Sequence, residues 1–318
     1  MSWVLKQSIF QLLTQISIMN LIKKYLLLFL EHISQVRYEI GFPILNINDF
    51  LSEGTLGETF FLKHCYRDRW FADPFILEVD NNSITLLVEE FFYSTQKGRI
   101  ARLTVSRSNY HLISNELVLE LDSHLSFPFI YRENGHVFIC PESSCSSTWK
   151  EYEYDVENNQ IINERIIINE ALTDAIIDDK GRILTTKVPD TNSSFLTVYT
   201  KNGGDSYKEL TRISFNEKIA RNAGAIFKVG NRFFRPAQEC NFAYGHAVVI
   251  QEITDYDLLS FMECCRIVSP HKILKDGCHT FNTFRGVFVI DVNGPRYPRL
   301  RKLASNCYSI YRKLSLVK

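Results

Sequence analysis

The sequence predicts an all-β fold, a five-bladed β-propeller, with an N-terminal helical segment and a short C-terminal helical tail. Two observations predict the propeller. A unit made of a strand, a tight polar turn and a second strand recurs about every fifty residues, and further strand-like runs lie between the recurrences. Repeats of this length built from short strands are typical of propeller blades. A β-sandwich with chance similarity is the alternative, and the regular spacing favours the propeller.

The repeat is clearest in residues 70–90 and 125–142. Each stretch runs from an aromatic-rich strand through a polar turn to a second strand that ends in a carboxylate, as at Glu142. Three weaker copies predict further strands, each followed by a turn and a partner strand, over 172–177, 222–227 and 278–282. The equivalent positions 73, 127, 174, 222 and 278 are 54, 47, 48 and 56 residues apart.

Further strands are expected between these hairpins, in the runs Gly98–Val105, Trp149–Tyr154, Phe195–Tyr199 and Ala247–Ile253. Four strands per unit and five units complete the propeller, which we expect over residues 38–294. The helical segment over 1–37 precedes it, and the basic tail over 295–318 follows it.

The two ends of the chain have helical patterns. In residues 1–37 the longest uninterrupted apolar run, Tyr25–Leu30, is far shorter than the ~20 residues needed to cross a bilayer. No small-residue cleavage site follows, so no secretory signal is expected. This segment is either a helix packed on the propeller or one that docks to a membrane interface or a partner. The tail from Arg296 mixes basic and apolar residues, which suits either peripheral contact with the inner face of a membrane or a solvated helix.

The composition limits the partners and the compartment. The 318 residues include 36 basic and 36 acidic side chains, and this balance argues against a nucleic-acid partner. The eight cysteines show neither a CxxC pair nor zinc-ligand spacing, which predicts a reducing, cytoplasmic compartment and no structural disulfides. We find no phosphate-binding loop, dinucleotide glycine motif or metal-ligand spacing, so no cofactor and no metal are expected.

Candidate catalytic residues come from the equivalent positions of the repeat. The innermost strands of a propeller line a central funnel, so these positions form a ring: Asp73, Phe127, Asp174, Asn222 and Cys278. Two carboxylates that face one cavity suit glycosyl chemistry, in which one activates the nucleophile and another protonates the leaving oxygen. We expect Asp73 and Asp174 to be the leading pair, with Glu142 or Glu239 as the proton donor. Alternatively, Asp73 and Asp174 only cap turns.

Polar and aromatic residues near the ends of the inner strands are candidates for substrate binding. Arginine, glutamine and tyrosine together suit a sugar or a sugar phosphate, because the guanidinium fork matches an anionic group. For Arg235 and Gln238 a structural network between blades explains the residues equally well. The full candidate set is Trp70, Glu90, Arg235, Gln238, Tyr244, His279 and Asn282.

These residues resemble a known family, the N-terminal domain of glucosamine inositolphosphorylceramide transferase and its bacterial relatives. The resemblance covers about residues 38–292 and rests on Trp-x-Ala-Asp-Pro-Phe (70–75), Glu-Glu-Phe (89–91), Ser-Phe-Pro-Phe (126–129), Pro-Glu-Ser (141–143), Arg-Pro-Ala-Gln-Glu-Cys (235–240), Tyr-Gly (244–245) and His-Thr-Phe-Asn (279–282). That domain is in turn similar to the five-bladed propellers of arabinanases, β-xylosidases, levansucrases and invertases.

The resemblance implies a carbohydrate-active propeller. By analogy with the glycosidases, Asp73 would be the base or nucleophile and Asp174 would tune the acid and hold the sugar. The arabinanase general acid has no counterpart at 221–224, whereas Glu239-Cys240 is similar to the Glu-Cys of invertases. In the plant transferase, sugar transfer is attributed to a separate C-terminal domain.

Three functions follow as alternatives. The first is glycosyl transfer in the biosynthesis of a cell-surface polysaccharide or glycolipid, on a nucleotide- or lipid-linked sugar at the cytoplasmic face of the membrane. The second is glycoside hydrolysis with Asp73 as base. The third is non-catalytic sugar binding in the service of a partner glycosyltransferase. The sequence places the first ahead of the second.

Overall fold

The computed structural model describes residues 25, 29, 33, 35–143, 146–204 and 206–302. Tyr38–Asn293 forms one compact unit, and the described residues outside it, including the helical residues 298–302, belong to a second unit. The predicted helical segment 1–37 and basic tail 295–318 lie largely outside the described residues. Within the described part of the chain, no helix combines the length and apolar composition that a membrane crossing requires.

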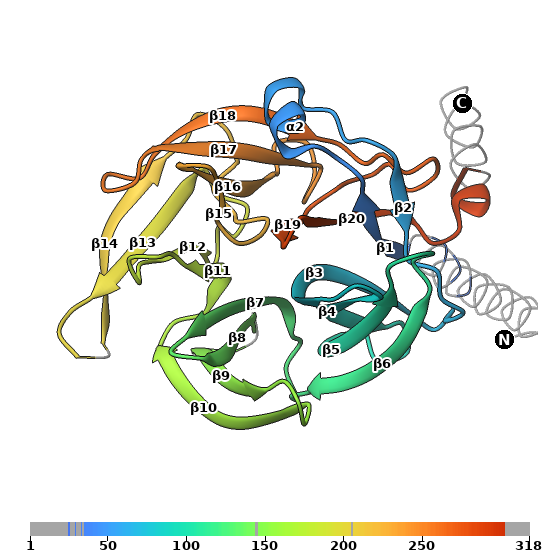
Figure 1. Cartoon of the computed structure of the whole chain (residues 1–318), viewed down its shortest axis with the longest axis horizontal. Coiled ribbons are helices and arrows are strands. Elements are labelled where there is room, and N and C mark those ends of the chain that lie inside the picture. Colours follow the sequence, from blue (N-terminus) through green and yellow to red (C-terminus); the bar gives the residue numbers. More distant parts are fainter. Residues whose placement is uncertain are drawn as a thin grey trace, which may run out of the picture. The chain divides into compact units, whose positions relative to one another are not determined.

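The unit Tyr38–Asn293 is built from five four-stranded sheets arranged around a common centre (Figure 1), so the predicted five-bladed all-β propeller is confirmed. Blade I contains β3 (Arg69–Val79), β4 (Ser83–Phe92), β5 (Lys97–Ser106) and β6 (Leu112–Leu119), and blade II contains β7 (Ser126–Glu133), β8 (His136–Glu142), β9 (Trp149–Asp155) and β10 (Gln160–Ile168). Blade III contains β11 (Leu172–Ile177), β12 (Ile183–Lys187), β13 (Phe195–Lys201) and β14 (Tyr207–Ser214), and blade IV contains β15 (Phe227–Val229), β16 (Arg232–Glu239), β17 (Ala247–Asp255) and β18 (Ser260–Ile267).

Blade V joins strands from the two sides of the chain. Its order is β19 (Phe281–Phe284), β20 (Val287–Pro295), β1 (Val36–Pro43) and β2 (Thr59–Phe61), so the first strands of the sequence complete the sheet that the last strands begin. The short helix α2 (Ile47–Glu53) connects β1 to β2, with Asn46 as its N-cap and Gly54 at φ 70° as its C-cap. The ring therefore closes through a pairing of distant segments.

The predicted first strands of blades IV and V begin too early. The strands expected over 222–227 and 278–282 are wrong, because β15 starts at Phe227 and β19 at Phe281. The preceding residues are loops that lie at the centre of the propeller. Here the Asn222 side-chain amide donates to the carbonyl oxygens of Asp174 and Leu184, at 2.7 and 2.8 Å. The Asn222 side chain thus ties this loop to blade III, while its backbone keeps an isolated bridge to Ala237 of β16.

Three blades share a bulge at the repeated position. Asp73, Phe127 and Asp174 have φ angles of 50°, 44° and 44°, and the pairing with the next strand is interrupted at each of them. A bulge leaves the residue's own N–H outside the ladder, and here a carboxylate of the preceding blade accepts it. Asp291 accepts the N–H of Asp73 at 2.9 Å, Asp73 accepts that of Phe127 at 3.0 Å, and Glu142 accepts that of Asp174 at 3.0 Å. These hydrogen bonds link blades V, I, II and III at the centre.

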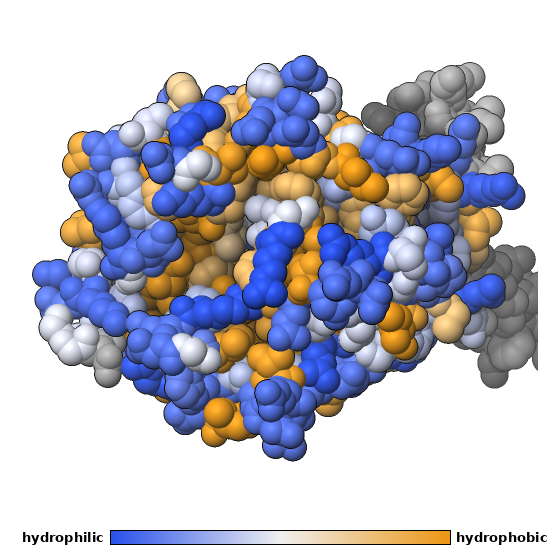
Figure 2. All heavy atoms as spheres, in the orientation of Figure 1, coloured by the Kyte–Doolittle hydropathy of each residue, from blue (hydrophilic) through white to orange (hydrophobic). Residues whose placement is uncertain are grey.

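The hairpin ends of the inner strands, away from these bulges, border a separate cavity of 470 Å³ between blades II and III. Figure 2 shows one face of the molecule, on which hydrophilic side chains surround more apolar, recessed ones. Two carboxylates of the cavity are paired: Glu151 accepts from Tyr131 and from Arg165, and Asp178 pairs with Arg182. Of the described buried side-chain atoms that lack a hydrogen-bond partner, none belongs to a residue that lines this cavity.

Candidate active site

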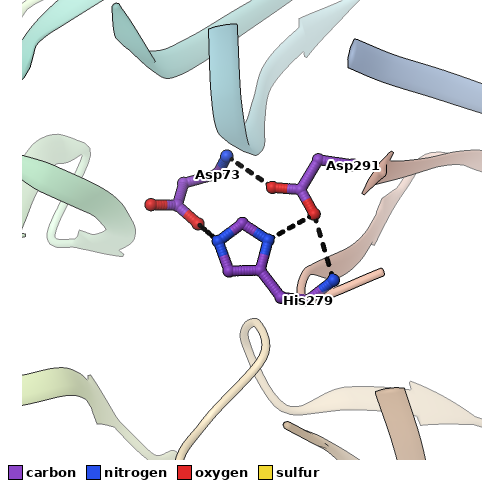
Figure 3. A group of neighbouring side chains, drawn as sticks. All are labelled: Asp73, His279 and Asp291. Carbon is purple, nitrogen blue, oxygen red and sulfur yellow. Dashed lines mark hydrogen bonds and ion pairs between the residues drawn. The ribbon is translucent and has the colours of Figure 1, made fainter. Parts of the chain in front are cut away.

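The centre of the site is a histidine held between two aspartates from different blades. His279 Nδ1 lies 2.6 Å from Asp291 Oδ1, and His279 Nε2 lies 3.2 Å from Asp73 Oδ1 (Figure 3). Asp291 also accepts the backbone N–H groups of His279 and Thr280, at 3.2 and 3.0 Å, and so fixes the turn that carries the imidazole. All three side chains are buried, with Asp73 4% exposed.

Burial and neighbouring charges perturb the protonation of this group. Burial alone would lower the pKa of His279, but Asp291 and Asp73 outweigh it and raise that pKa to about 9. Burial raises the pKa of Asp73 to about 7; His279 opposes this shift, and Asp291 and Asp174 add to it. Although burial would raise the pKa of Asp291, His279 holds it below its usual range. At neutral pH an imidazolium therefore bridges an ionised Asp291 and an Asp73 that titrates.

A second cluster surrounds Asp174. Arg221 Nε donates to Asp174 Oδ2 at 2.6 Å, and Arg221 Nη2 lies 3.4 Å from Glu142 Oε2. Gln238 Nε2 also donates to Asp174 Oδ2 at 2.6 Å. Burial, followed by the charge of Asp174, raises the pKa of Glu142, while Arg221 opposes the shift. The structure therefore brings Asp73, Asp174, Glu142 and Gln238 together, as expected for residues of one funnel.

Aromatic rings cover the imidazole. Tyr38 and Tyr244 lie on His279 with ring centroids 5.0 and 5.4 Å away, and Tyr38 also contacts Trp70 at 4.6 Å. Tyr244 additionally lies over the guanidinium of Arg221 at 4.7 Å. Since Tyr244 is 41% exposed while His279 is 2% exposed, the aromatic residues separate the charged cluster from solvent.

The two adjacent glutamates of β4 point to opposite sides of blade I. Glu90 is bound by Arg69 and Arg99 at 2.8 Å each and by Asn115 at 2.7 Å, outside the central cluster. Glu89, in contrast, is coupled electrostatically to Asp73 and the other central carboxylates, which together with burial raise its pKa well above the usual range. Glu90 therefore lies outside the central cluster and Glu89 within it, and substrate contact by Glu90 stays a prediction.

Three other predicted residues serve the framework. Arg235 is fully buried and binds Asn222 at 2.8 Å and Gln251 at 2.6 Å, which supports the structural alternative for this arginine. Glu239 Oε1 accepts the N–H of Asn241 at 2.6 Å in its own loop, and no described hydrogen bond or ion pair joins it to Asp73. Asn282 ties blades together by donating to the carbonyl oxygen of Pro74 at 2.9 Å.

Several central residues were not predicted from the sequence. Asp291 lies in the apolar run of β20, whose sequence pattern predicts only a buried strand. An aspartate within such an apolar run is unusual, and this is the signal that could have identified Asp291 as functional. Arg221 directly precedes the ring position Asn222, and Tyr38 lies on β1, outside every recognisable copy of the repeat.

Asp73, His279 and Asp291 could offer a metal ion one ligand atom each, all within 4.8 Å of one another. However, the 2.6 Å between His279 Nδ1 and Asp291 Oδ1 is a hydrogen-bond distance, and both ring nitrogens face carboxylate oxygens. The arrangement fits a protonated imidazole better than a metal ligand.

Some buried polar atoms in the cluster lack partners. Glu89 Oε1, Gln238 Oε1 and Thr280 Oγ1 have no hydrogen-bond partner in the described part of the chain. Leaving such an atom unpaired costs about 1–3 kcal/mol, so a bound polar molecule would repay that cost. Gln238 Oε1 and Thr280 Oγ1 are thus candidate contacts for a polar molecule at the centre.

The fold and the site define the chain as a five-bladed propeller with a buried carboxylate and histidine centre. Residues 59–292 match the family model described as "Glucosamine inositolphosphorylceramide transferase 1, N-terminal", and the chain belongs to this carbohydrate-related family. The resemblance stated from the sequence motifs is therefore confirmed.

Similarity to individual proteins is weaker. The chain is 24% identical over 209 residues to glucosamine inositolphosphorylceramide transferase 1 of Oryza sativa subsp. indica and of subsp. japonica, a match that covers 59% of this chain and 27% of the rice proteins. The chain thus spans about a quarter of the length of these relatives. A GH43_1 enzyme from Xanthomonas citri complexed with xylotriose is similar at 10% identity, with a TM-score of 0.49, over 72% of this chain and 88% of that chain.

Proposed function

We propose that the propeller binds a sugar at its centre and takes part in glycosyl transfer, with Asp73 as the general base. The observation that carries the proposal is the Asp73–His279–Asp291 array. A general base works best when its pKa is near the operating pH, and the pKa of Asp73 is about 7. In the reaction, Asp73 accepts the proton of an acceptor hydroxyl as that oxygen forms its bond to the sugar.

The charge of the cluster supports a neutral sugar as the buried group. The cluster holds five carboxylic groups against two cationic side chains, Arg221 and His279; the five are Asp73, Glu89, Glu142, Asp174 and Asp291. An additional phosphate would be repelled there. We therefore place the sugar ring of a nucleotide- or lipid-linked donor at the centre and its phosphate outside, and we propose glucosamine, the sugar in the family's name, as the first sugar to test.

A thermal-shift screen of nucleotide sugars, glucosaminides and oligosaccharides would test the proposal, followed by product analysis for every ligand found. Wild type and Asp73→Asn are compared, with Asp178→Asn as the matched control, because Asp178 is a buried aspartate that lines the separate cavity at the hairpin ends. We expect wild type and the control to form product and Asp73→Asn to lose about 10²–10⁴-fold in rate. If no ligand binds, the proposal fails.

A specific observation favours a second candidate, non-catalytic sugar binding for a partner transferase. Asp73, Asp291 and Glu142 each accept a backbone N–H at a bulge, and this alone could explain why these carboxylates are buried. In that case sugars bind but no product forms with any acceptor. Release of free sugar without an acceptor would instead indicate hydrolysis.

A further inference from the structure

We propose that Glu89 is the proton donor of this site and that His124 is the residue that positions its carboxyl group. The inference rests on the proposed glycosyl chemistry and adds the group that protonates the leaving oxygen. The sequence had suggested Glu142 or Glu239 for that role, and the surroundings of Glu89 fit it better.

Glu89 is placed beside the base. It pairs with Ala72 across β3 and β4, so it lies next to the bulge that carries Asp73. The residue is 5% exposed, and its Oε1 is completely buried; His124 Nε2 faces this oxygen at 3.4 Å without forming a hydrogen bond, and no other described residue bonds to it. A carboxylate in such surroundings would be strongly destabilised, whereas a neutral carboxylic acid is tolerated.

Glycine at position 98 makes the approach of His124 to Glu89 possible. A Cβ at Gly98 would lie 2.6 Å from Glu89 Oε1, 2.6 Å from the carbonyl oxygen of Leu125 and 2.9 Å from His124 Cε1. Three groups therefore converge on the space that a side chain would fill. The backbone at Gly98 is not in the left-handed region, so this space explains the glycine.

Hydrogen bonds to Gly98 fix the imidazole of His124. The N–H of Gly98 donates to His124 Nδ1 at 3.0 Å, and the N–H of Leu125 donates to the carbonyl oxygen of Gly98 at 3.0 Å. Because Nδ1 accepts a hydrogen bond, the ring proton is on Nε2, which faces Glu89 Oε1 at 3.4 Å. An N–H that faces Oε1 leaves the acidic proton on Oε2.

The surrounding charges act in the same direction. Asp73, Glu142, Asp291 and Asp174, as well as burial, raise the pKa of Glu89, and burial lowers the pKa of His124. The cationic groups of the cluster are engaged elsewhere: Arg221 binds Asp174 and Glu142, and His279 binds Asp73 and Asp291. A neutral histidine thus faces a protonated glutamate near neutral pH.

The alternatives are less suitable as acids. Burial and the charge of Asp174 raise the pKa of Glu142 as well, but Glu142 Oε2 accepts the N–H of Asp174 at 3.0 Å and lies 3.4 Å from the Arg221 guanidinium, and both contacts oppose that rise. In the proposed step the Glu89 proton moves to the leaving oxygen, which joins the sugar at the centre to the group outside the cluster, as the bond between the sugar and this oxygen breaks. Asp73 receives the acceptor's proton, and exchange with solvent restores both groups afterwards.

The test compares leaving groups on Glu89→Gln, using 2,4-dinitrophenyl and methyl glucosaminides of both anomers with an alcohol acceptor. The methyl glycoside requires an acid and the dinitrophenyl glycoside does not. We expect the rate of Glu89→Gln on the methyl glycoside to fall about 10²–10⁴-fold, and its rate on the dinitrophenyl glycoside to stay within about tenfold of wild type. The variant should also lose the alkaline limb of the pH–rate profile. Glu151→Gln, a buried glutamate of the hairpin-end cavity, serves as the control for folding.

Equal losses on both donors, or no loss, would overturn the role of Glu89 while leaving the proposed transfer intact. No turnover by wild type would overturn both. A readout independent of turnover is the infrared absorption of protonated carboxyl groups at neutral pH, to which Asp73 and Glu142 also contribute. Glu89→Gln should remove one component of this band, and Glu151→Gln should leave the band unchanged. If that band is unchanged in Glu89→Gln, Glu89 is not the acid.

For His124→Phe, which removes the Nε2–H, we expect the alkaline limb of the pH–rate profile to move to higher pH, whereas a merely structural role would leave it in place.

Discussion

Asp73 Oδ2 accepts the backbone N–H of Phe127, its equivalent in the next blade, at 3.0 Å. The other oxygen of the same carboxylate faces His279. One side chain thus joins two blades and belongs to the candidate reaction centre. Substitutions at Asp73 should separate these two contributions, because asparagine keeps an acceptor oxygen and alanine does not.

We expect Asp73→Ala to lower the free energy of unfolding by about 1–3 kcal/mol, since the buried N–H of Phe127 loses its acceptor. Asp73→Asn should unfold closer to wild type while losing activity. Urea denaturation of both variants measures the difference. Equal stability of the two variants would show that the hydrogen bond to Phe127 contributes little.

The stability of the propeller should fall as the pH rises. The pKa of His279 is about 9 instead of the usual 6.5, and that of Asp73 is about 7 instead of 3.8. Both groups bind protons more strongly in the folded chain than in the unfolded one. Their stabilising contribution is therefore complete below the unfolded pKa and is lost as the pH passes the folded pKa, mainly between about pH 4 and 9.

Melting temperatures measured from pH 6 to 9 should decrease, and the decrease should be smaller in His279→Asn. Parallel curves for the two proteins would contradict this assignment.

Removing Arg221 should be costly because it leaves two buried carboxylates without their cation. Arg221→Met is expected to lower the free energy of unfolding by about 3–5 kcal/mol. The matched change Arg212→Met removes an exposed pair with Glu209, which solvent screens, and should cost much less. Chemical denaturation of both variants provides the comparison, and similar losses would argue against a special role of the buried pair.

Gly245 and Gly230 allow the contact with His279 to be isolated. Their φ angles are 59° and 60°, but a Cβ at Gly245 would lie 2.4 Å from His279 Cβ, whereas nothing lies within 4 Å at Gly230. Both alanine variants bear the strain of a left-handed residue, about 1–2 kcal/mol. Only Gly245→Ala should in addition displace the imidazole and reduce sugar binding. Equal binding by the two variants would place the ligand away from His279.

Much of the fold could be predicted because it is encoded locally. Polar turns and strand alternation recur in each blade, so the five sheets and the ring positions Asp73 and Asp174 follow from the repeat. The first strands of blades IV and V were misplaced because the residues before Phe227 and Phe281 keep only the isolated bridges Asn222–Ala237 and Gly277–Asn293, which no propensity reveals.

The rest of the site depends on contacts between distant residues. The N–H of Asp73 meets the carboxylate of Asp291 across 218 positions of sequence, and Asp291 has no equivalent in the other copies. The pair Glu89–Glu90 shows a further limit. Because side chains alternate along a strand, only one of these two neighbours can face the centre, and only the folded sheet shows that it is Glu89.

The central claim is that a sugar binds against His279 and Asp73. NMR of the ¹⁵N-labelled histidines, with the His279 signals assigned from His279→Asn, tests it most directly when the chain is titrated with a saccharide. We predict that the His279 signals titrate with a pKa of about 9 in the free chain and shift on sugar addition. Unchanged His279 signals during saturable sugar binding would contradict the claim.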